Sequence, residues 1–177
     1  MIPISRILGV KYLRKLVFSG IVLTIIFLTG CAREGYHTVH PVGPDFVAAG
    51  DSQPFAWPLI GTVAVPFGAR EDGVRTKGIV IEAREGSAVV AARDGRVQFV
   101  EDGMPGYGRT VVIEHSPDFS TVYARNKEVI VALGQWVRRG ETIARAGRSA
   151  RGAAPQLYFE IRRKSKAVDP LQFLRSS

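Results

Sequence analysis

The chain has 177 residues, of which 46% are hydrophobic, and this length is sufficient for one well-packed domain with shorter flanking segments. Its 24 basic and 16 acidic residues give a formal net charge of +8. Four of the basic residues fall within the first 30 positions, which leaves 20 minus 16, or +4, for residues 31–177. The sequence contains no helix-turn-helix, zinc-finger or RNA-stacking motif, so its basic balance does not indicate binding to nucleic acid.

The first 30 residues are predicted to be a signal peptide. A basic segment, Met1–Lys15, precedes an apolar run of 13 residues, Leu16–Leu28. A membrane-spanning helix needs about 20 apolar residues, so this run is short for a span but typical of the core of a signal peptide.

The residues that follow this run, Leu28-Thr29-Gly30-Cys31, resemble the bacterial lipobox. The resemblance implies cleavage after Gly30 and lipidation of Cys31, so the membrane becomes a partner through the lipid anchor. Cys31 is the single cysteine, which excludes an intrachain disulfide. Ala32 after the cysteine favours, by analogy with enterobacterial sorting, an outer-membrane protein that faces the periplasm. The alternative is an uncleaved signal anchor with an incidental cysteine.

Residues 31–56 are predicted to be the lipidated cysteine and a flexible tether. The segment has no clear hydrophobic period and is interrupted by Gly, Pro, Asp and Ser. A flexible chain of this length reaches roughly 25–30 Å, which keeps the following domain near the membrane and within reach of peptidoglycan. His37 and His40 could bind a metal ion, but no carboxylate or thiolate cluster accompanies them, so solvated histidines are the favoured interpretation.

Residues 57–174 are predicted to form one all-β domain. Short runs rich in Val, Ile, Tyr and Phe alternate with Gly-containing turns about every ten residues, a pattern typical of a sandwich or barrel. Asp94-Gly95 lies between the runs Ala88–Ala92 and Arg96–Val100 and predicts a β-hairpin there. No amphipathic helix of about ten residues or more is predicted after the leader.

A series of short motifs follows in order through this domain. They are Trp57-Pro58, Pro66-Phe67-Gly68, Lys77-Gly78-Ile79, Ala91–Val97, Gly106-Tyr107-Gly108, Val112–His115, Thr121–Ala124, Gly134–Val137, Phe159–Arg162 and Val168–Leu171. Together they resemble the LytM, or lysostaphin-type, zinc endopeptidase domain of peptidase family M23. The resemblance implies a two-layer antiparallel β fold, the duplicated hybrid motif, with a long groove.

The positions that carry the zinc ligands and catalytic histidines of active family members hold other residues here. The resemblance places Thr76 and Val80 at a metal histidine and a metal aspartate, and Arg125 at a catalytic histidine. Gln156 and Tyr158 replace the histidine pair of the groove strand. Catalytic zinc needs about three N, O or S ligands and an open water position, and water activation needs a base. The resemblance therefore predicts a pseudoenzyme without metal, cofactor or catalytic residues, and an active zinc endopeptidase is the least favoured alternative.

Two other β architectures are excluded by the residues that they require. Val131–Ala144 resembles a turn of biotinyl and lipoyl carrier domains, but the lysine that those domains modify is absent. Sugar-transport phosphocarrier domains need a histidine pair, whereas His115 is the sole histidine of the predicted domain. The M23 family commonly has a histidine at this place without using it as a ligand, so no metal-binding role is expected for His115.

The non-catalytic members of the family include the murein hydrolase activators of the EnvC and NlpD type, which bind a cell-wall amidase, often during cell division. The resemblance therefore predicts a lipoprotein that binds and activates an N-acetylmuramoyl-L-alanine amidase or another cell-wall hydrolase. The groove expected to receive the partner is lined by Thr76, Lys77, Val80, Arg125, Gln156 and Tyr158. Two alternatives stay open: this groove binds peptidoglycan directly, or the protein is a scaffold that does not activate an amidase.

Overall fold

The computed structural model describes residues 53–71, 73–148 and 154–175. The predicted signal peptide, the lipidation site Cys31 and the tether histidines His37 and His40 lie outside these ranges. Across the described ranges, no helix is long and apolar enough to cross a membrane.

The described residues form short strands and a single turn of 3₁₀ helix, which confirms the all-β prediction. The strands are β1 (Phe55–Ala56), β2 (Val63–Val65), β3 (Arg70–Glu71), β4 (Val74–Arg75), β5 (Ile79–Glu82), β6 (Ala88–Val90), β7 (Gly95–Met104), β8 (Gly108–Glu114), β9 (Phe119–Val129), β10 (Trp136–Val137), β11 (Thr142–Ala146), β12 (Gln156–Arg163), β13 (Lys166–Val168) and β14 (Leu174–Arg175). The 3₁₀ turn η1 (Pro170–Gln172) precedes β14, and its first turn is capped by the side chain of Asp169.

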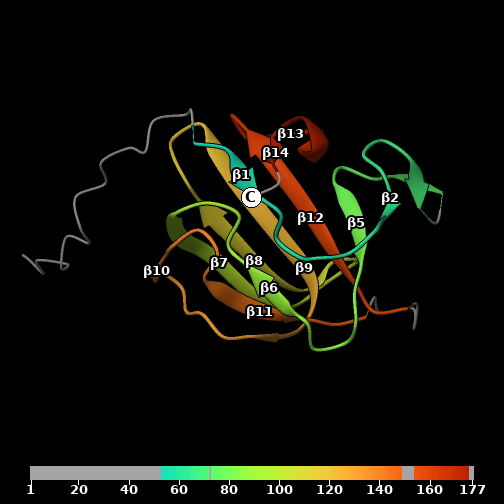
Figure 1. Ribbon diagram of the computed structural model, residues 1–177, viewed down its shortest axis with the longest axis horizontal. Coiled ribbons are helices and arrows are strands. Elements are labelled where there is room, and N and C mark those ends of the chain that lie inside the picture. Colours follow the sequence, from blue (N-terminus) through green and yellow to red (C-terminus); the bar gives the residue numbers. More distant parts are fainter. Residues whose placement is uncertain (1–52, 72, 149–153, 176–177) are drawn as a thin grey trace, which may run out of the picture. The chain divides into compact units, whose positions relative to one another are not determined.

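Most strands belong to one antiparallel sheet with the order β10-β7-β8-β9-β12-β5-β2 (Figure 1). The strand β11 pairs with both β9 and β6, and β13 pairs with β12. Two short pairs stand apart from this sheet. The parallel pair of β1 and β14 brings Phe55 beside Leu174, and so joins the beginning of the domain to its end. The antiparallel pair of β3 and β4 forms a sheet of its own.

The central strand β12 divides the buried side chains into two groups. Successive residues of a strand point to opposite faces of its sheet. Leu157, Phe159 and Ile161 point to one face, where each is fully buried in the main hydrophobic core. Tyr158 points to the other face and packs in a separate small cluster, while Glu160 on that same face is also fully buried. The second face of β12 is therefore a distinct polar and aromatic environment, and the candidate site lies there.

The predicted hairpin at Asp94-Gly95 is wrong, because the strands on its two sides do not pair. β6 pairs with β11, whereas β7 pairs with β8 and β10. Asp94 is exposed, but the residue before it is held in the core: Arg93 is 1% exposed, with its guanidinium over the rings of Phe55 and Phe119. Gly95 packs so closely against β8 that a Cβ would lie 2.4 Å from the carbonyl oxygen of Glu114.

Candidate functional site

The residues predicted to line the groove come together around strands β5, β9 and β12. In the antiparallel register, Tyr158 of β12 lies between Val80 of β5 and Ala124 of β9. Arg125 follows Ala124 on β9, and Thr76 precedes β5. The spacing of the motifs along the chain therefore identified positions that the fold brings close together.

The small cluster at the centre of this site is closely packed and largely apolar. Val80, Ala124 and Tyr158 are its buried members, and Val65 and Tyr107 pack against them. Five of the six predicted groove residues are at most 9% exposed, and Lys77 is the exposed one. The predicted groove residues are thus mostly buried, and Lys77 is the one that faces solvent.

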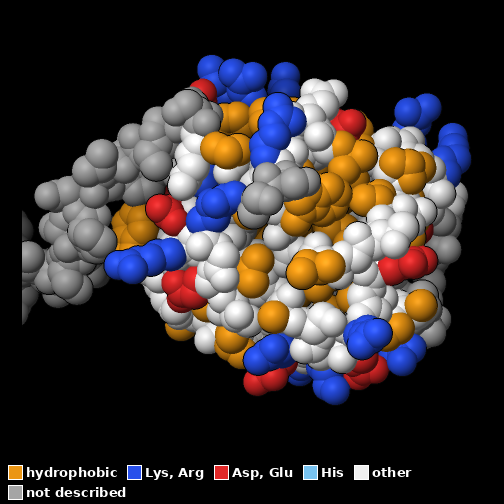
Figure 2. Space-filling model, viewed as in Figure 1, with side chains coloured by type: hydrophobic (Ala, Val, Ile, Leu, Met, Phe, Trp, Pro, Cys, Tyr) orange, Lys and Arg blue, Asp and Glu red, His pale blue; other side chains and the backbone are white. Residues whose placement is uncertain are grey.

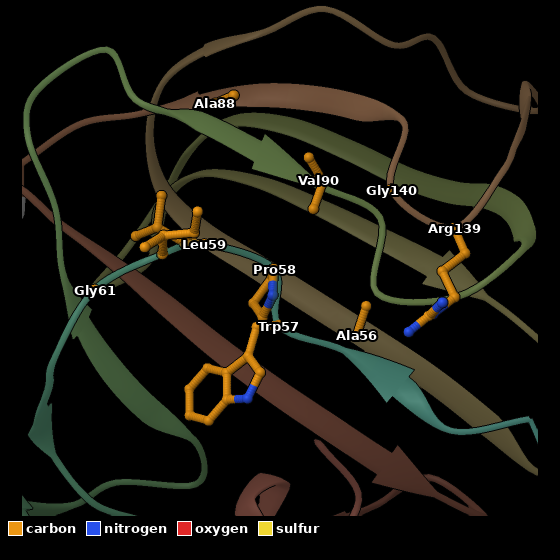
Figure 3. A pocket seen from close by; sticks show the side chains of 10 residues that line it. Ala56, Trp57, Pro58, Leu59, Gly61, Ala88, Val90, Arg139 and Gly140 are labelled. Carbon is orange, nitrogen blue, oxygen red and sulfur yellow. The ribbon is translucent and has the colours of Figure 1, made fainter. Parts of the chain in front are cut away.

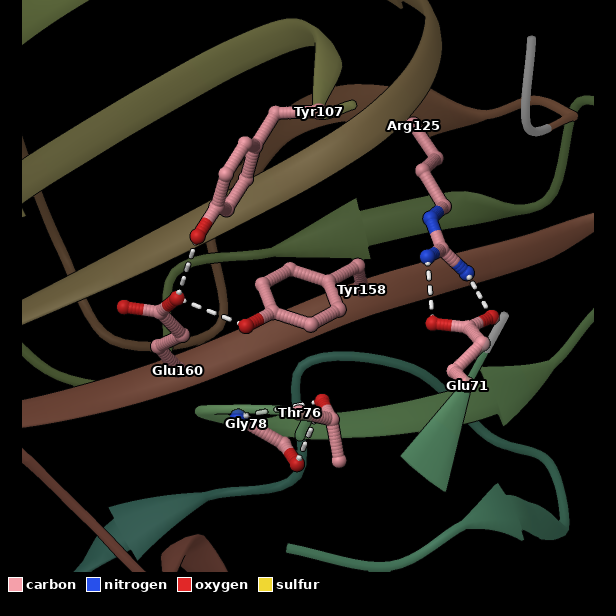
Figure 4. Close-up of polar contacts among 7 residues, drawn as sticks. All are labelled: Glu71, Thr76, Gly78, Tyr107, Arg125, Tyr158 and Glu160. Carbon is pink, nitrogen blue, oxygen red and sulfur yellow. Dashed lines mark hydrogen bonds and ion pairs between the residues drawn. The ribbon is translucent and has the colours of Figure 1, made fainter. Parts of the chain in front are cut away.

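Thr76 is held against the backbone of the segment that enters β5. Its hydroxyl donates to the carbonyl oxygen of Gly78 at 3.2 Å, and the amide of Gly78 approaches the same hydroxyl oxygen at 3.4 Å (Figure 4). Gly78 itself is required by close approach, because a Cβ there would lie 2.2 Å from the carbonyl oxygen of Phe159. The absence of a side chain at residue 78 thus lets β5 lie directly against β12.

Arg125 forms a bidentate ion pair that could not be predicted from the sequence. Its two terminal nitrogens donate to the two carboxylate oxygens of Glu71, at 2.8 and 2.7 Å (Figure 4). The guanidinium also lies over the ring of Tyr158, with its central carbon 5.3 Å from the ring centroid. The cation is therefore neutralised from within the chain and does not face solvent as an unpaired charge.

A buried carboxylate organises the other end of the site. Glu160 is 0% exposed and accepts hydrogen bonds from the hydroxyl of Tyr158 at 2.6 Å and from that of Tyr107 at 3.1 Å. Its second oxygen accepts from Nε of Arg162 at 2.7 Å. Burial, followed by contact with Glu160, raises the pKa of Tyr158 and of Tyr107 above the usual phenol value. Both hydroxyls therefore remain protonated donors, and the two rings meet edge to face 5.2 Å apart.

His115 lies in the main core, away from this site, and has a structural role. The residue is 3% exposed, with Nδ1 2.8 Å from the carbonyl oxygen of Asp94 and Nε2 2.7 Å from the hydroxyl of Thr121. Burial lowers the pKa of His115 to about 4, so the imidazole is neutral at pH 7. A neutral ring can satisfy both contacts if Nδ1 donates to the carbonyl and Nε2 accepts from Thr121.

The family model described as "Peptidase family M23" matches residues 74–170. The chain belongs to peptidase family M23. The matched segment contains all six predicted groove residues and runs from β4 to the start of η1. The contacts of Tyr158, Arg125 and Glu160 described above thus lie within the matched segment, apart from the pairing of Arg125 with Glu71 and the packing of Val65 against the Tyr158 cluster.

The sequence is also similar to several curated relatives. It is 39% identical over 140 residues to "Murein hydrolase activator NlpD" of Salmonella typhimurium, covering 77% of this chain and 36% of that protein. It is 42% identical to "Murein hydrolase activator EnvC" of Escherichia coli, covering 67% and 28%. "Uncharacterized lipoprotein YgeR" of Escherichia coli is 40% identical, with coverage of 67% and 46%. The chain therefore spans less than half the length of these relatives.

The domain is also similar to solved structures with the same fold. A zinc-containing peptidase from Vibrio cholerae superposes with a TM-score of 0.62 at 27% identity, covering 67% of this chain and 40% of that one. A chain from the SpoIIQ–SpoIIIAH pore-forming complex superposes with a TM-score of 0.61 at 26% identity, covering 69% and 91%. These similarities confirm the LytM-type fold that the sequence motifs predicted.

Three residues of the site could not be identified from the sequence. Tyr107 and Glu160 lie within motifs that indicated the fold, but nothing in their spacing indicated that they would share a hydrogen-bonded cluster with Tyr158. Glu71 lies outside every motif used, and only the folding of β3 and β4 brings it to Arg125.

An apolar pocket was also missed, and it lies away from this site. It has a volume of about 620 Å³ and is lined mainly by the segment from Ala56 to Gly61, by β6 and by Arg139 (Figure 3). Ile60 at its edge is 99% exposed. Figure 2 shows apolar side chains gathered near the centre of one face of the molecule, with Lys and Arg around the periphery.

Proposed function

We propose that this protein is a lipid-anchored, non-catalytic member of the M23 family that binds a cell-wall amidase and increases its activity. The observation that carries the proposal is the nature of the site. An arginine–glutamate pair and an apolar cluster lie at the positions where active members of the family have a metal centre. The proposed activity, activation of a cell-wall hydrolase, is inferred from relatives that are named murein hydrolase activators and are about two-fifths identical over the same domain.

The chemistry of the five replaced positions supports the absence of catalysis. Thr76 uses its hydroxyl to hold the Gly78 peptide, and Val80 is apolar and fully buried. Tyr158 is a protonated phenol that donates to Glu160, and the guanidinium of Arg125 is already paired with Glu71 and has no lone pair to offer a metal ion. No three His, Cys, Asp or Glu side chains gather into a metal-binding group within the described residues. These residues do not fit the open, three-ligand site that catalytic zinc requires.

The envelope location rests on the lipobox resemblance at Cys31 and on the relatives. Several of them are named lipoproteins, including "Lipoprotein NlpD/LppB homolog" of Pseudomonas aeruginosa and "Outer membrane antigenic lipoprotein B" of Haemophilus influenzae. We place the protein at the outer membrane, facing the periplasm, with a tether that ends before β1 (Phe55–Ala56) carrying the folded domain toward the wall, so the tether is shorter than the predicted 31–56. There it would serve cell-wall remodelling or cell separation.

The proposed partner is an N-acetylmuramoyl-L-alanine amidase, and binding to it is the direct test. Each purified amidase of the organism is immobilised in turn, and binding of the purified chain is followed by biolayer interferometry. Saturable binding to at least one amidase, with a rise in its activity, is the expected result. If every amidase fails to bind, the activator proposal is wrong.

The second candidate function is a wall-binding or scaffold module. It is favoured by the fold similarity to a chain of the SpoIIQ–SpoIIIAH pore-forming complex, which is an assembly of proteins. Sedimentation with purified sacculi separates the two functions. A scaffold that binds peptidoglycan pellets with sacculi in the absence of amidase, whereas the activator stays in the supernatant until the amidase is added.

A further inference from the structure

The guanidinium of Arg125 is held in a fixed position, as is typical of a preorganised anion-binding group. The residue is 9% exposed and has a φ of 67°, a left-handed conformation that L-residues with side chains seldom adopt. Its backbone is fixed by bonds to Tyr107 and Gly147, and its side chain lies over the ring of Tyr158. Strained conformations of this kind persist where the surrounding structure determines them, and they cluster at binding and switch sites.

A second feature of Arg125 points independently to a ligand. Its Nε is buried and has no hydrogen-bond partner. A buried polar atom without a partner is uncommon, because losing the hydrogen bond to water is costly. The guanidinium is thus held in place by the backbone and the Tyr158 ring, while its hydrogen-bonding capacity is not exhausted by Glu71.

Glu71, in contrast, is weakly attached to the domain. It lies on β3, which pairs only with β4 in a separate sheet of two residues per strand. A two-stranded pair of this size is marginally stable by itself. The side chain of Glu71 is 25% exposed, against 10% for Arg125, and Val74 opposite it is 70% exposed. Glu71 can therefore move into water at lower cost than Arg125 can.

We propose that Arg125 is the recognition group for an acidic side chain of the partner protein, and that Glu71 fills this position until the partner binds. The inference rests on the proposed function and deepens it. The exchange replaces one carboxylate by another, so Arg125 is never left as a buried, unpaired charge, and Glu71 gains solvation.

The surroundings of the pair indicate what the partner segment contains besides its carboxylate. The cluster of Val80, Ala124 and Tyr158 lies beside the ion pair, because the Arg125 guanidinium lies over the ring of Tyr158. A segment with an Asp or Glu flanked by apolar residues would place its carboxylate on Arg125 and its apolar side chains next to this cluster. A protein segment fits better than a peptidoglycan stem because the surroundings of Arg125 are apolar and aromatic, whereas stem carboxylates would be met by Arg125 alone.

The two sides of the ion pair should respond in opposite directions when each is neutralised. In Glu71→Gln the internal competitor is weakened, so the full-length chain in detergent should reach half-maximal amidase activation at a roughly tenfold lower concentration. In Arg125→Gln activation should be lost. Glu85→Gln is the matched control, because Glu85 also forms a carboxylate–cation pair, with Lys127 and Arg148, but on the exposed surface. That control should leave the activation curve unchanged.

A purely structural ion pair gives a different result. Glu71→Gln and Arg125→Gln would then impair activation together, each in proportion to its loss of thermal stability, and this outcome would overturn the proposal. Activation by Glu71→Gln no better than by the unaltered chain would do the same.

A binding measurement separates this inference from the proposed function. The NMR resonance of the Arg125 Nε–H group is first assigned as the signal that disappears in Arg125→Lys. The full-length chain is then titrated with acetyl-Leu-Glu-Leu-amide and with acetyl-Leu-Gln-Leu-amide, and the chemical shift of this resonance is followed. A shift produced by the Glu peptide alone, and larger in Glu71→Gln, supports the inference even if no amidase responds. Equal effects of the two peptides would contradict it, and a response to soluble muropeptides but not to the Glu peptide would show that the partner class is wrong.

Discussion

Protonation of His115 should make the domain less stable as the pH falls below neutrality. The imidazole has an ordinary pKa of 6.5 in the unfolded chain, and burial lowers its pKa to about 4 in the folded domain. Between these values the unfolded chain binds more protons than the folded one, so the free energy of unfolding decreases as the pH falls. The full contribution of the neutral ring is present above pH 6.5 and is lost on acidification toward pH 4.

The size of the effect follows from the difference between the two pKa values. A difference of about 2.5 units corresponds to about 3 kcal/mol over the whole range, of which about 2 kcal/mol is lost between pH 7.5 and pH 5. Most carboxylates stay ionised at pH 5. The change in the free energy of unfolding between pH 7.5 and pH 5 therefore reports mainly on His115 and not on the protonation of Asp and Glu.

Urea denaturation of residues 41–177 measures this loss. The fragment is the compact unit that contains the domain, and it leaves out His37 and His40. Fluorescence of Trp57 and Trp136 reports unfolding. The free energy of unfolding should fall by about 2 kcal/mol from pH 7.5 to pH 5 in the original sequence and by clearly less in His115→Gln. Equal pH dependence in both would refute the assignment of a buried neutral imidazole.

Three further changes test the packing and the site. Gly78→Ala should cost about 1–3 kcal/mol or more, because its Cβ would meet the Phe159 carbonyl; unchanged urea unfolding would show that β5 and β12 are less close than described. Tyr158→Phe should cost about 1–2 kcal/mol, because Glu160 loses a buried donor; an unchanged or higher melting temperature would contradict that role. Zinc or a chelator should leave the melting temperature unchanged, and stabilisation by zinc would reveal a metal site in the folded domain.

The sequence was sufficient for the fold class and for predicting that residues far apart along the chain lie close together in the candidate site. Alternating apolar residues in runs such as Leu157–Ile161 predicted strands, and the motif order predicted the family. The same motifs placed Val80, Arg125 and Tyr158 near one another, and the register of β5, β9 and β12 brings them together. These features are local or follow from a family pattern, so they can be recognised along the chain.

Features that depend on long-range packing could not be predicted. Asp94-Gly95 has the composition of a hairpin turn, but Arg93 before it is buried over the rings of Phe55 and Phe119, and the flanking strands β6 and β7 pair with β11 and β8 instead of with each other. The burial of the polar side chains of Thr76 and Gln156 could not be predicted from their positions along the chain. The partner of Arg125 also escaped prediction, because Glu71 is 54 residues away and belongs to no motif.

Release of dye from labelled peptidoglycan tests the central claim most directly. The purified protein is incubated with the labelled wall alone, with each amidase of the organism, and with added zinc or a chelator. We predict no release by the protein alone under any metal condition, and increased release when it accompanies one amidase. Release by the protein alone that a chelator abolishes would contradict the account, because it would require a catalytic metal site.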